Sequence, residues 1–256
     1  MPNFNYLNRQ ANNYSINSKT VFSPLGNIHP HLIERVFEFA YQMTFGQEGE
    51  HRAHRTGGTH QRHRGEIFAN TFQGKLAECA LYCVLKEQGL NVSKPDFNVF
   101  SLGEWDSEDL KIGTELISIK STKSYGNLLL LEEHDWDEEA TYLPNRHGYD
   151  YTFLIRMNPF CEDILRRNRF LYSDSINKII LKDKIMSENW IFDIPGYVTR
   201  NDLIYVINHN YLIPRGSMLN GSTRMDASNY YVQTGDMRNL ASFLQILDKE
   251  KDIWLL

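Results

Sequence analysis

The stretch from Ser107 to Thr122 constrains the fold more than any other part of the chain. It reads Ser-Glu-Asp-Leu-Lys-Ile-Gly-Thr-Glu-Leu-Ile-Ser-Ile-Lys-Ser-Thr. Apolar residues alternate with polar ones on both sides of Gly113-Thr114, which is the pattern of two short strands joined by a tight turn. The stretch therefore predicts a β-hairpin in which Ile112 faces Glu115.

The two faces of this hairpin differ in chemistry. One face is apolar and should be buried, and it comprises Leu110, Ile112, Ile117 and Ile119. The other face is polar, and it comprises Asp109, Lys111, Ser118 and Lys120. The register sets Asp109 opposite Ser118, with directly opposed Cβ atoms about 5 Å apart and diagonal ones roughly 7–8 Å apart. We therefore expect Asp109 and Lys120 to converge on one small polar site.

This arrangement resembles the PD-(D/E)XK nuclease superfamily, which includes most type II restriction endonucleases and the Mrr-like enzymes. In that superfamily an Asp opens one strand and a (D/E)-X-K triplet lies on the next. Here the Asp would be Asp109 and the triplet Ser118-Ile119-Lys120, within a match that spans roughly residues 70–156. Ser118 stands where the superfamily usually has an acid, and some members replace that acid or supply it from elsewhere.

The resemblance implies a fold of the α/β (α+β) class, with a mixed central sheet flanked by helices and core elements in the order α-β-β-β-α-β. It also implies Mg²⁺-dependent hydrolysis of phosphodiester bonds in double-stranded DNA by a site-specific type II enzyme acting as a homodimer. Asp109 and the main-chain carbonyl of Ile119 would hold Mg²⁺, and Lys120 would act on the attacking water and the scissile phosphate. The alternatives are a structural ion pair between Lys120 and Asp109, and a DNA-binding or interaction protein whose catalytic site has decayed.

A further acid is expected from the helix before the hairpin. Apolar residues at helical spacing predict a helix over 68–88, with Gly89 as its stop. Superfamily members often carry an acid on this first helix, and Glu78 is the residue we expect to serve as a catalytic and metal-binding acid. The alternative is a surface Glu78 paired with Lys75 or Lys86.

Other acids compete for these roles. Glu132 or Glu133, which follow four leucines, could return the acid that Ser118 does not supply, or they could simply be solvated. Pro95-Asp96 also matches the "PD" of the superfamily name. We prefer Asp109 because cross-strand pairing brings it to Lys120, whereas Asp96 is expected to open its own strand through an Asx-type turn.

Positive charge gathers in one segment, although the net charge of the chain is −5. Residues 51–64 hold four His and four Arg around a Gly-Gly pair. The plain interpretation is a solvated flexible loop. With a nuclease-like site following it, we expect the loop to bind DNA phosphates through Arg52, Arg55, Arg62 and Arg64. A metal site built from these histidines is disfavoured by their irregular spacing.

A second loop, residues 214–225, is basic and rich in small residues. Arginine and asparagine are suited to reading base edges in a DNA groove, so Arg215, Arg224 and the following Asn229 are candidate DNA-binding residues. An ordinary connection between elements is the alternative.

The remaining elements complete the expected organisation. Residues 1–29 are predicted to be a loose polar arm and 30–256 a single domain, with a catalytic core at about 67–157 and a C-terminal elaboration at 158–256 that serves DNA recognition. Within these regions the sequence predicts helices over 31–47, 161–168 and 202–208, strands over 91–101 and 149–157, and a turn at 194–197.

Several classes are excluded by what the sequence lacks. No apolar run approaches the ~20 residues of a membrane span, and the first residues do not resemble a signal peptide, so we expect a cytoplasmic protein. Three cysteines make no disulfide framework. There is no P-loop, dinucleotide fingerprint or Gly-x-Ser-x-Gly elbow.

Overall fold

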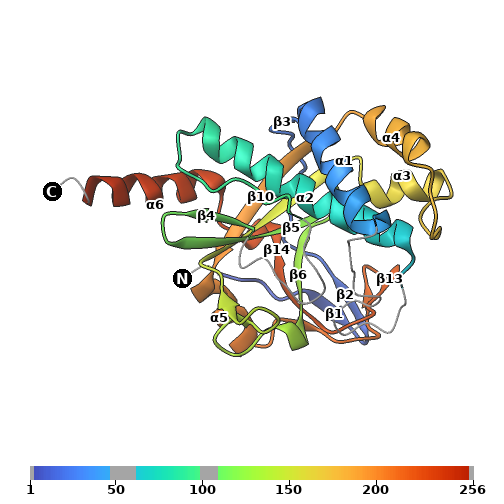
Figure 1. Cartoon of the computed structure of the whole chain (residues 1–256). Helices are drawn as coiled ribbons and strands as arrows, with labels where there is room; N and C mark the ends of the chain where they lie inside the picture. The colour runs from blue at the N-terminus through green and yellow to red at the C-terminus, as the bar shows by residue number, and fades with distance from the viewer. Residues whose placement is uncertain (1–2, 47–61, 99–108, 254–256) are drawn as a thin grey trace.

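The computed structural model describes residues 3–46, 62–98 and 109–253, with side chains as far as Leu247. A five-stranded mixed sheet lies at its centre (Figure 1). Its strands follow the order β3 (Gly26–Asn27), β10 (Ile191–Thr199), β9 (Tyr151–Asn158), β5 (Glu115–Lys123) and β4 (Leu110–Ile112). Strands β5 and β9 are parallel, and the other neighbours are antiparallel. The mixed α and β architecture expected from the sequence is confirmed.

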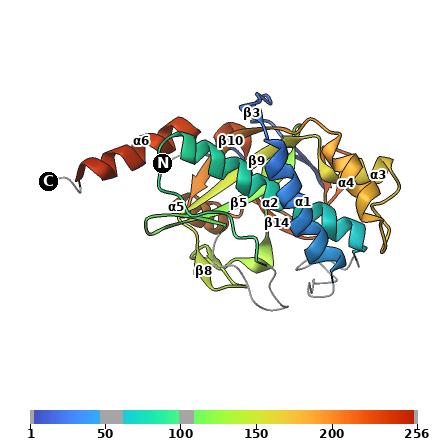
Figure 2. The ribbon, with the colours of Figure 1, turned by 45° about the horizontal axis from the view of Figure 1, so that its top comes forward.

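Helices cover one face of this sheet (Figure 2). They are α1 (Pro30–Phe45), α2 (Arg64–Glu87), α3 (Cys161–Arg167), α4 (Lys178–Met186) and the beginning of α6 (Leu240–Ile253), whose remainder extends away from the body of the molecule in both views. The first hydrophobic core lies between these helices and the sheet, and includes Phe72, Leu76, Phe153 and Phe243. The helices predicted over 31–47, 68–88 and 161–168 are confirmed, and α2 begins one turn earlier than predicted because Glu66 and Asp174 accept the N–H groups of His63 and Arg64.

The other face of the central sheet packs against a second sheet. This sheet has three strands in the order β11 (Leu212–Ile213), β14 (Asn229–Gln233) and β6 (Leu128–Glu132), and α5 (Arg200–Asn208) lies beside it. Leucines of β6 form part of the second hydrophobic core. Strand β9 is buried on both faces because Phe153 points into the first core and Leu154 into the second.

The N-terminal residues are not a loose arm, which corrects the prediction for 1–29. Strands β1 (Asn8–Gln10) and β2 (Asn13–Ser15) pair with β12 (Met218–Leu219) and β13 (Thr223–Arg224) in a four-stranded sheet. Phe4, Leu7 and Tyr14 are buried in the second core. The few apolar residues of this polar segment therefore dock it onto the domain.

Three further expectations differ from the structure. Of the strand predicted over 91–101, the described residues 91–98 form only one bridge, from Val92 to Ile112. The turn predicted at 194–197 is a β-bulge inside β10, where Pro195 needs no ladder donor. The helix that α-β-β-β-α-β requires between β5 and β9 is absent: residues 124–150, all described, form β6, the 3₁₀ turn η1 (Glu133–Asp135), β7 (Thr141–Tyr142) and β8 (His147–Gly148).

No helix in the described ranges is both long enough and apolar enough to cross a membrane.

Candidate functional site

The predicted hairpin is present with the predicted register. Strand β4 pairs with β5 through Leu110↔Ile117 and Ile112↔Glu115. Leu110 and Ile117 are fully buried against the helices, and Lys111 is exposed. The division into an apolar and a polar face follows from this alternation.

Asp109 lies immediately before β4 and binds the backbone of β5. Its Oδ2 atom accepts the N–H of Ile119 at 2.5 Å, and its own N–H donates to the carbonyl of Ile117 at 3.2 Å. The N–H and C=O of a strand residue point to the same neighbouring strand, so the carbonyl of Ile119 also opens toward Asp109. The two oxygen donors expected to hold Mg²⁺ therefore lie at one edge of the sheet.

Lys120 points to the side of β5 that faces the second core. Its Nζ atom lies 5.7 Å from the ring centre of Tyr142, and Ser118, on the same face, is only 2% exposed. Within the described residues, neither a hydrogen bond nor an ion pair joins Lys120 to Asp109. The backbone register is as predicted, but the side chains of Asp109 and Lys120 do not contact each other in this structure.

Glu78 is buried on α2 rather than exposed at its surface. Its Oε2 atom lies 2.5 Å from Nζ of Lys75, and both side chains are about nine-tenths buried. Lys75 is therefore the partner that the alternative interpretation named, but the surface position it assumed is wrong. Burial, followed by the charge of Glu78, raises the pKa of the neighbouring Cys79 thiol to about 12.

A hollow of 480 Å³ joins the two aspartates that competed for the metal role. It is lined by Asp109 and Asp96, together with Arg35, Lys94, Phe97 and Asn98. The guanidinium of Arg35 lies 4.0 Å from the ring centre of Phe97, and Nζ of Lys75 lies 6.0 Å from the same centre. Phe97 thus connects the buried Glu78–Lys75 pair with the hollow beside Asp109.

Asp96 has the local role that the sequence predicted, although the strand it was expected to open is missing. Its Oδ1 atom accepts the N–H of Asn98 at 2.8 Å, which is an Asx-type turn.

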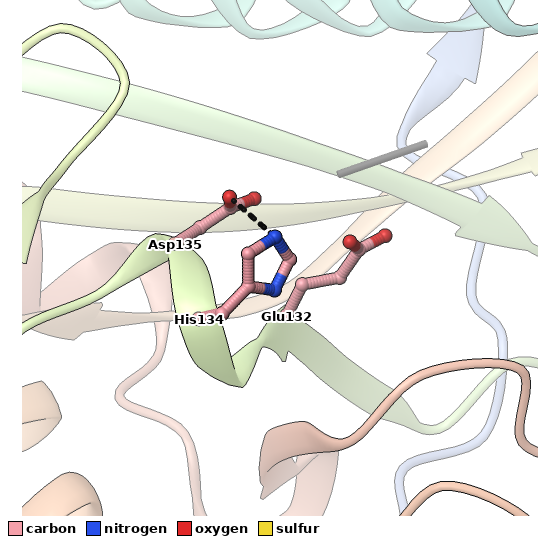
Figure 3. Close-up of side chains that lie close together, drawn as sticks. All are labelled: Glu132, His134 and Asp135. Atoms are coloured by element: carbon pink, nitrogen blue, oxygen red, sulfur yellow. Dashed lines mark ion pairs between the residues drawn. The ribbon is translucent and has the colours of Figure 1, made fainter. Parts of the chain in front are cut away.

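The other proposed acids lie at the end of β6. Glu132 is half-buried and pairs with Asn229 of β14, and the N–H of Glu133 donates to the carbonyl of Ser228 at 3.0 Å. Figure 3 shows Glu132 beside His134 and Asp135. Sequence reasoning missed His134 and Asp135, although the run Glu-Glu-His-Asp at 132–135 is itself a signal of potential metal ligands.

The basic segment is only partly described. Arg52 and Arg55 lie outside the described residues. Arg62 is half-buried, and Arg64 is exposed at the first position of α2. The exposed guanidinium of Arg64 is therefore available to a phosphate at the surface.

The second basic loop presents two of its three candidates at the surface. Arg215 and Arg224 are exposed, and Arg224 lies on β13. Asn229 is 7% exposed, and its side-chain amide donates to the carbonyl of Ala227 at 2.9 Å. A buried amide bound in this way does not reach a base edge, so Asn229 shapes the loop rather than contacting DNA.

No protein-family model matches the chain. Comparison with curated proteins gave no significant match, and comparison with solved structures gave none either.

Proposed function

We propose that this protein is a Mg²⁺-dependent endonuclease that hydrolyses phosphodiester bonds in double-stranded DNA, of the site-specific type II restriction kind. The observation that carries the proposal is the bond between the Asp109 carboxylate and the N–H of Ile119, next in the chain to Lys120. This bond joins the Asp that precedes β4 to Ile119-Lys120 of β5, which are the positions of the Asp and of the X-K pair in the resemblance to the nuclease superfamily.

The donors at this edge suit Mg²⁺. The carboxylate of Asp109 and the carbonyl of Ile119 are hard oxygen ligands, and Mg²⁺ commonly takes one or two protein carboxylates and keeps several waters. The adjoining hollow of 480 Å³ gives space for those waters and for a phosphate. Bound Mg²⁺ would supply Lewis-acid stabilisation of the charge that develops on the phosphoryl oxygens.

The side chains around this edge have separate roles in the proposal. Asp109 would hold the cation, and Glu78, whose partner Lys75 lies 6.0 Å from the ring centre of Phe97 at the wall of the hollow, would be the second acid. Arg35 and Lys94, which line the same hollow, neutralise the phosphates on either side of the cleaved bond. Lys120 turns from Tyr142 toward the scissile phosphate when DNA binds, and stabilises the attacking water and the developing charge.

DNA is held outside this site by basic residues that make phosphate contacts. The segment at 51–64 serves this purpose, whereas the exposed Arg215 and Arg224 would read base edges. Two copies of the chain would place two sites on the two strands of a symmetric sequence.

One observation favours a second candidate, a DNA-binding protein with a decayed site. Ser118 offers no carboxylate at the position where the superfamily has one, and it is buried. Incubation of the protein with plasmid DNA and Mg²⁺ separates the two candidates. Discrete fragments support the site-specific endonuclease, a smear indicates cleavage without site specificity, and DNA binding without Mg²⁺-dependent cleavage supports the decayed protein.

A further inference from the structure

We infer that Glu132, His134 and Asp135 form a binding site for a divalent transition-metal cation, separate from the oxygen donors at Asp109. Each residue offers one ligand atom, and these atoms all lie within 4.8 Å of one another. Figure 3 shows the imidazole of His134 between the two carboxyl groups. This inference does not depend on nuclease activity.

The backbone fixes all three residues at the junction of β6 and η1. Glu132 is held in the β6–β14 ladder, and the N–H of Glu133 binds the carbonyl of Ser228 at 3.0 Å. The 3₁₀ turn η1 follows, and Trp136 at its end is buried in the second core. The ring centre of Trp136 lies 5.2 Å from that of Tyr142. Ligands carried by such fixed elements keep their geometry before a cation arrives.

The spacing of the ligand atoms fits a shared cation. Nε2 of His134 and Oδ1 of Asp135 are 3.3 Å apart. Two ligands each about 2.1 Å from a tetrahedral ion are separated by about 3.4 Å, so these atoms already stand as neighbouring ligands would. A carboxylate oxygen of Glu132 lies within 4.8 Å of both atoms and provides the third ligand.

Electrostatics favours a cation at this place. The side chain of Asp135 is only 9% exposed, and the second carboxylate of the cluster, that of Glu132, is within 4.8 Å. Two carboxylates at that separation repel each other, and burial removes hydration from one of them. A dication offsets both costs. The side chain of His134 is 48% exposed, which gives the ion a path from solvent and leaves positions open for water.

The donor set selects the kind of cation. Mg²⁺ and Ca²⁺ prefer oxygen ligands alone, whereas an imidazole nitrogen with two carboxylate oxygens suits Co²⁺, Zn²⁺ or Mn²⁺. The site would therefore take a metal different from the one proposed at the all-oxygen edge formed by Asp109 and Ile119.

Equilibrium dialysis against Co²⁺ in excess Mg²⁺ tests the inference, since Mg²⁺ occupies sites made of oxygen alone. The chain has nine histidines, so the decisive quantity is the difference between variants. His134→Ala should bind about one Co²⁺ fewer per chain than wild type, because one ligand of three is lost. His147→Ala, which removes an exposed histidine of β8, should bind as many Co²⁺ ions as wild type.

A second measurement does not depend on counting ions. Saturating Co²⁺ should raise the Tm of wild type and of His147→Ala by more than that of His134→Ala, because a ligand that binds only the folded state stabilises it. Equal Co²⁺ binding by wild type and His134→Ala would overturn the site, as would the same loss in His147→Ala. His134 is exposed, so its replacement tests the site even if Asp135→Asn fails to fold.

Discussion

Glu78 is the residue on which the placement of the second acid depends. A carboxylate this deeply buried is costly unless it is paired, and Lys75 provides the pairing at 2.5 Å. Lys75 thus compensates the buried carboxylate of Glu78, while Glu132, at the end of β6, belongs to a different cluster.

We therefore expect Glu78→Gln to reduce Mg²⁺-dependent DNA cleavage by about 100-fold, and Glu132→Gln to reduce it by less than about 10-fold. Initial rates on plasmid DNA measure both effects, and circular dichroism checks that each variant is folded. Loss of activity in Glu132→Gln alone would show that β6, not α2, supplies the acid.

The carboxyl group of Asp202 makes the free energy of unfolding depend on pH. Burial alone would raise the pKa of this carboxyl, but hydrogen bonds from Arg238 and from Thr199 outweigh it and hold the pKa below its ordinary value. Because the pKa of Asp202 is lower in the folded than in the unfolded state, its carboxylate stabilises the fold fully at pH values above the unfolded pKa of about 3.9. This stabilisation is lost as the pH falls through the lower pKa of the folded state.

Asp202→Asn should accordingly lower the free energy of unfolding at pH 7 by roughly 1–3 kcal/mol and flatten its decline below about pH 4. Urea unfolding between pH 2 and pH 7 measures the curve. Asp183→Asn, at an exposed aspartate of α4, is the control and should change little. A curve for Asp202→Asn parallel to that of wild type would refute this role.

Among the elements, β9 is joined to distant segments by the side chain of Arg156. This guanidinium is 1% exposed, and it bonds both carboxylate oxygens of Asp193 in β10 at 2.8 and 2.6 Å. It also donates to the carbonyls of Thr20 and Val21 in the N-terminal segment. The buried guanidinium of Arg156 thus links β9 and β10 to residues 20 and 21 of the N-terminal segment.

Arg156→Met should cost about 3–5 kcal/mol in the free energy of unfolding, because it leaves Asp193 buried without its partner. Arg167→Met, which removes the surface ion pair between Arg167 of α3 and Glu188, should cost less than about 1 kcal/mol. Chemical denaturation of both variants makes the comparison. Similar losses in the two would contradict the role assigned to Arg156.

Local pattern predicted the elements whose residues repeat at a clear period. The β4–β5 hairpin, α1, α2, α3 and β9 follow from alternation or helical spacing near glycine or proline signals. The N-terminal strands did not, because Phe4, Leu7 and Tyr14 are too widely spaced to show a period and are buried only by the second core. The orientation of Lys120 depends on Tyr142, which lies beyond the hairpin, so the sequence of the hairpin alone could not show it.

At the scale of the whole molecule, the proposal requires positive charge that reaches DNA despite a net charge of −5. Residues 51–64 carry the densest run of cations, and α2 begins at Arg64, the last of them. Phosphate contacts release counterions and position the duplex without reading its sequence.

Replacement of Arg52, Arg55, Arg62 and Arg64 by Ala should flatten the salt dependence of DNA binding. Each lost contact removes about 0.9 from the log–log slope, so the change should approach about 3.6. Affinity should fall similarly for all duplexes, whereas Arg215→Ala and Arg224→Ala should mainly lower discrimination between sequences. Fluorescence anisotropy at several salt concentrations gives the slope, and an unchanged slope in the four-arginine variant would make the segment a solvated connection.

The rate of Mg²⁺-dependent plasmid cleavage by single variants of the β4–β5 hairpin shows whether this edge of the sheet cleaves DNA. Asp109→Asn and Lys120→Ala should each lower the rate by at least about 100-fold while remaining folded. Lys111→Ala, which removes an exposed lysine from the same hairpin, should retain the wild-type rate. A wild-type rate in Asp109→Asn or in Lys120→Ala would show that this edge of the sheet is not where DNA is cleaved.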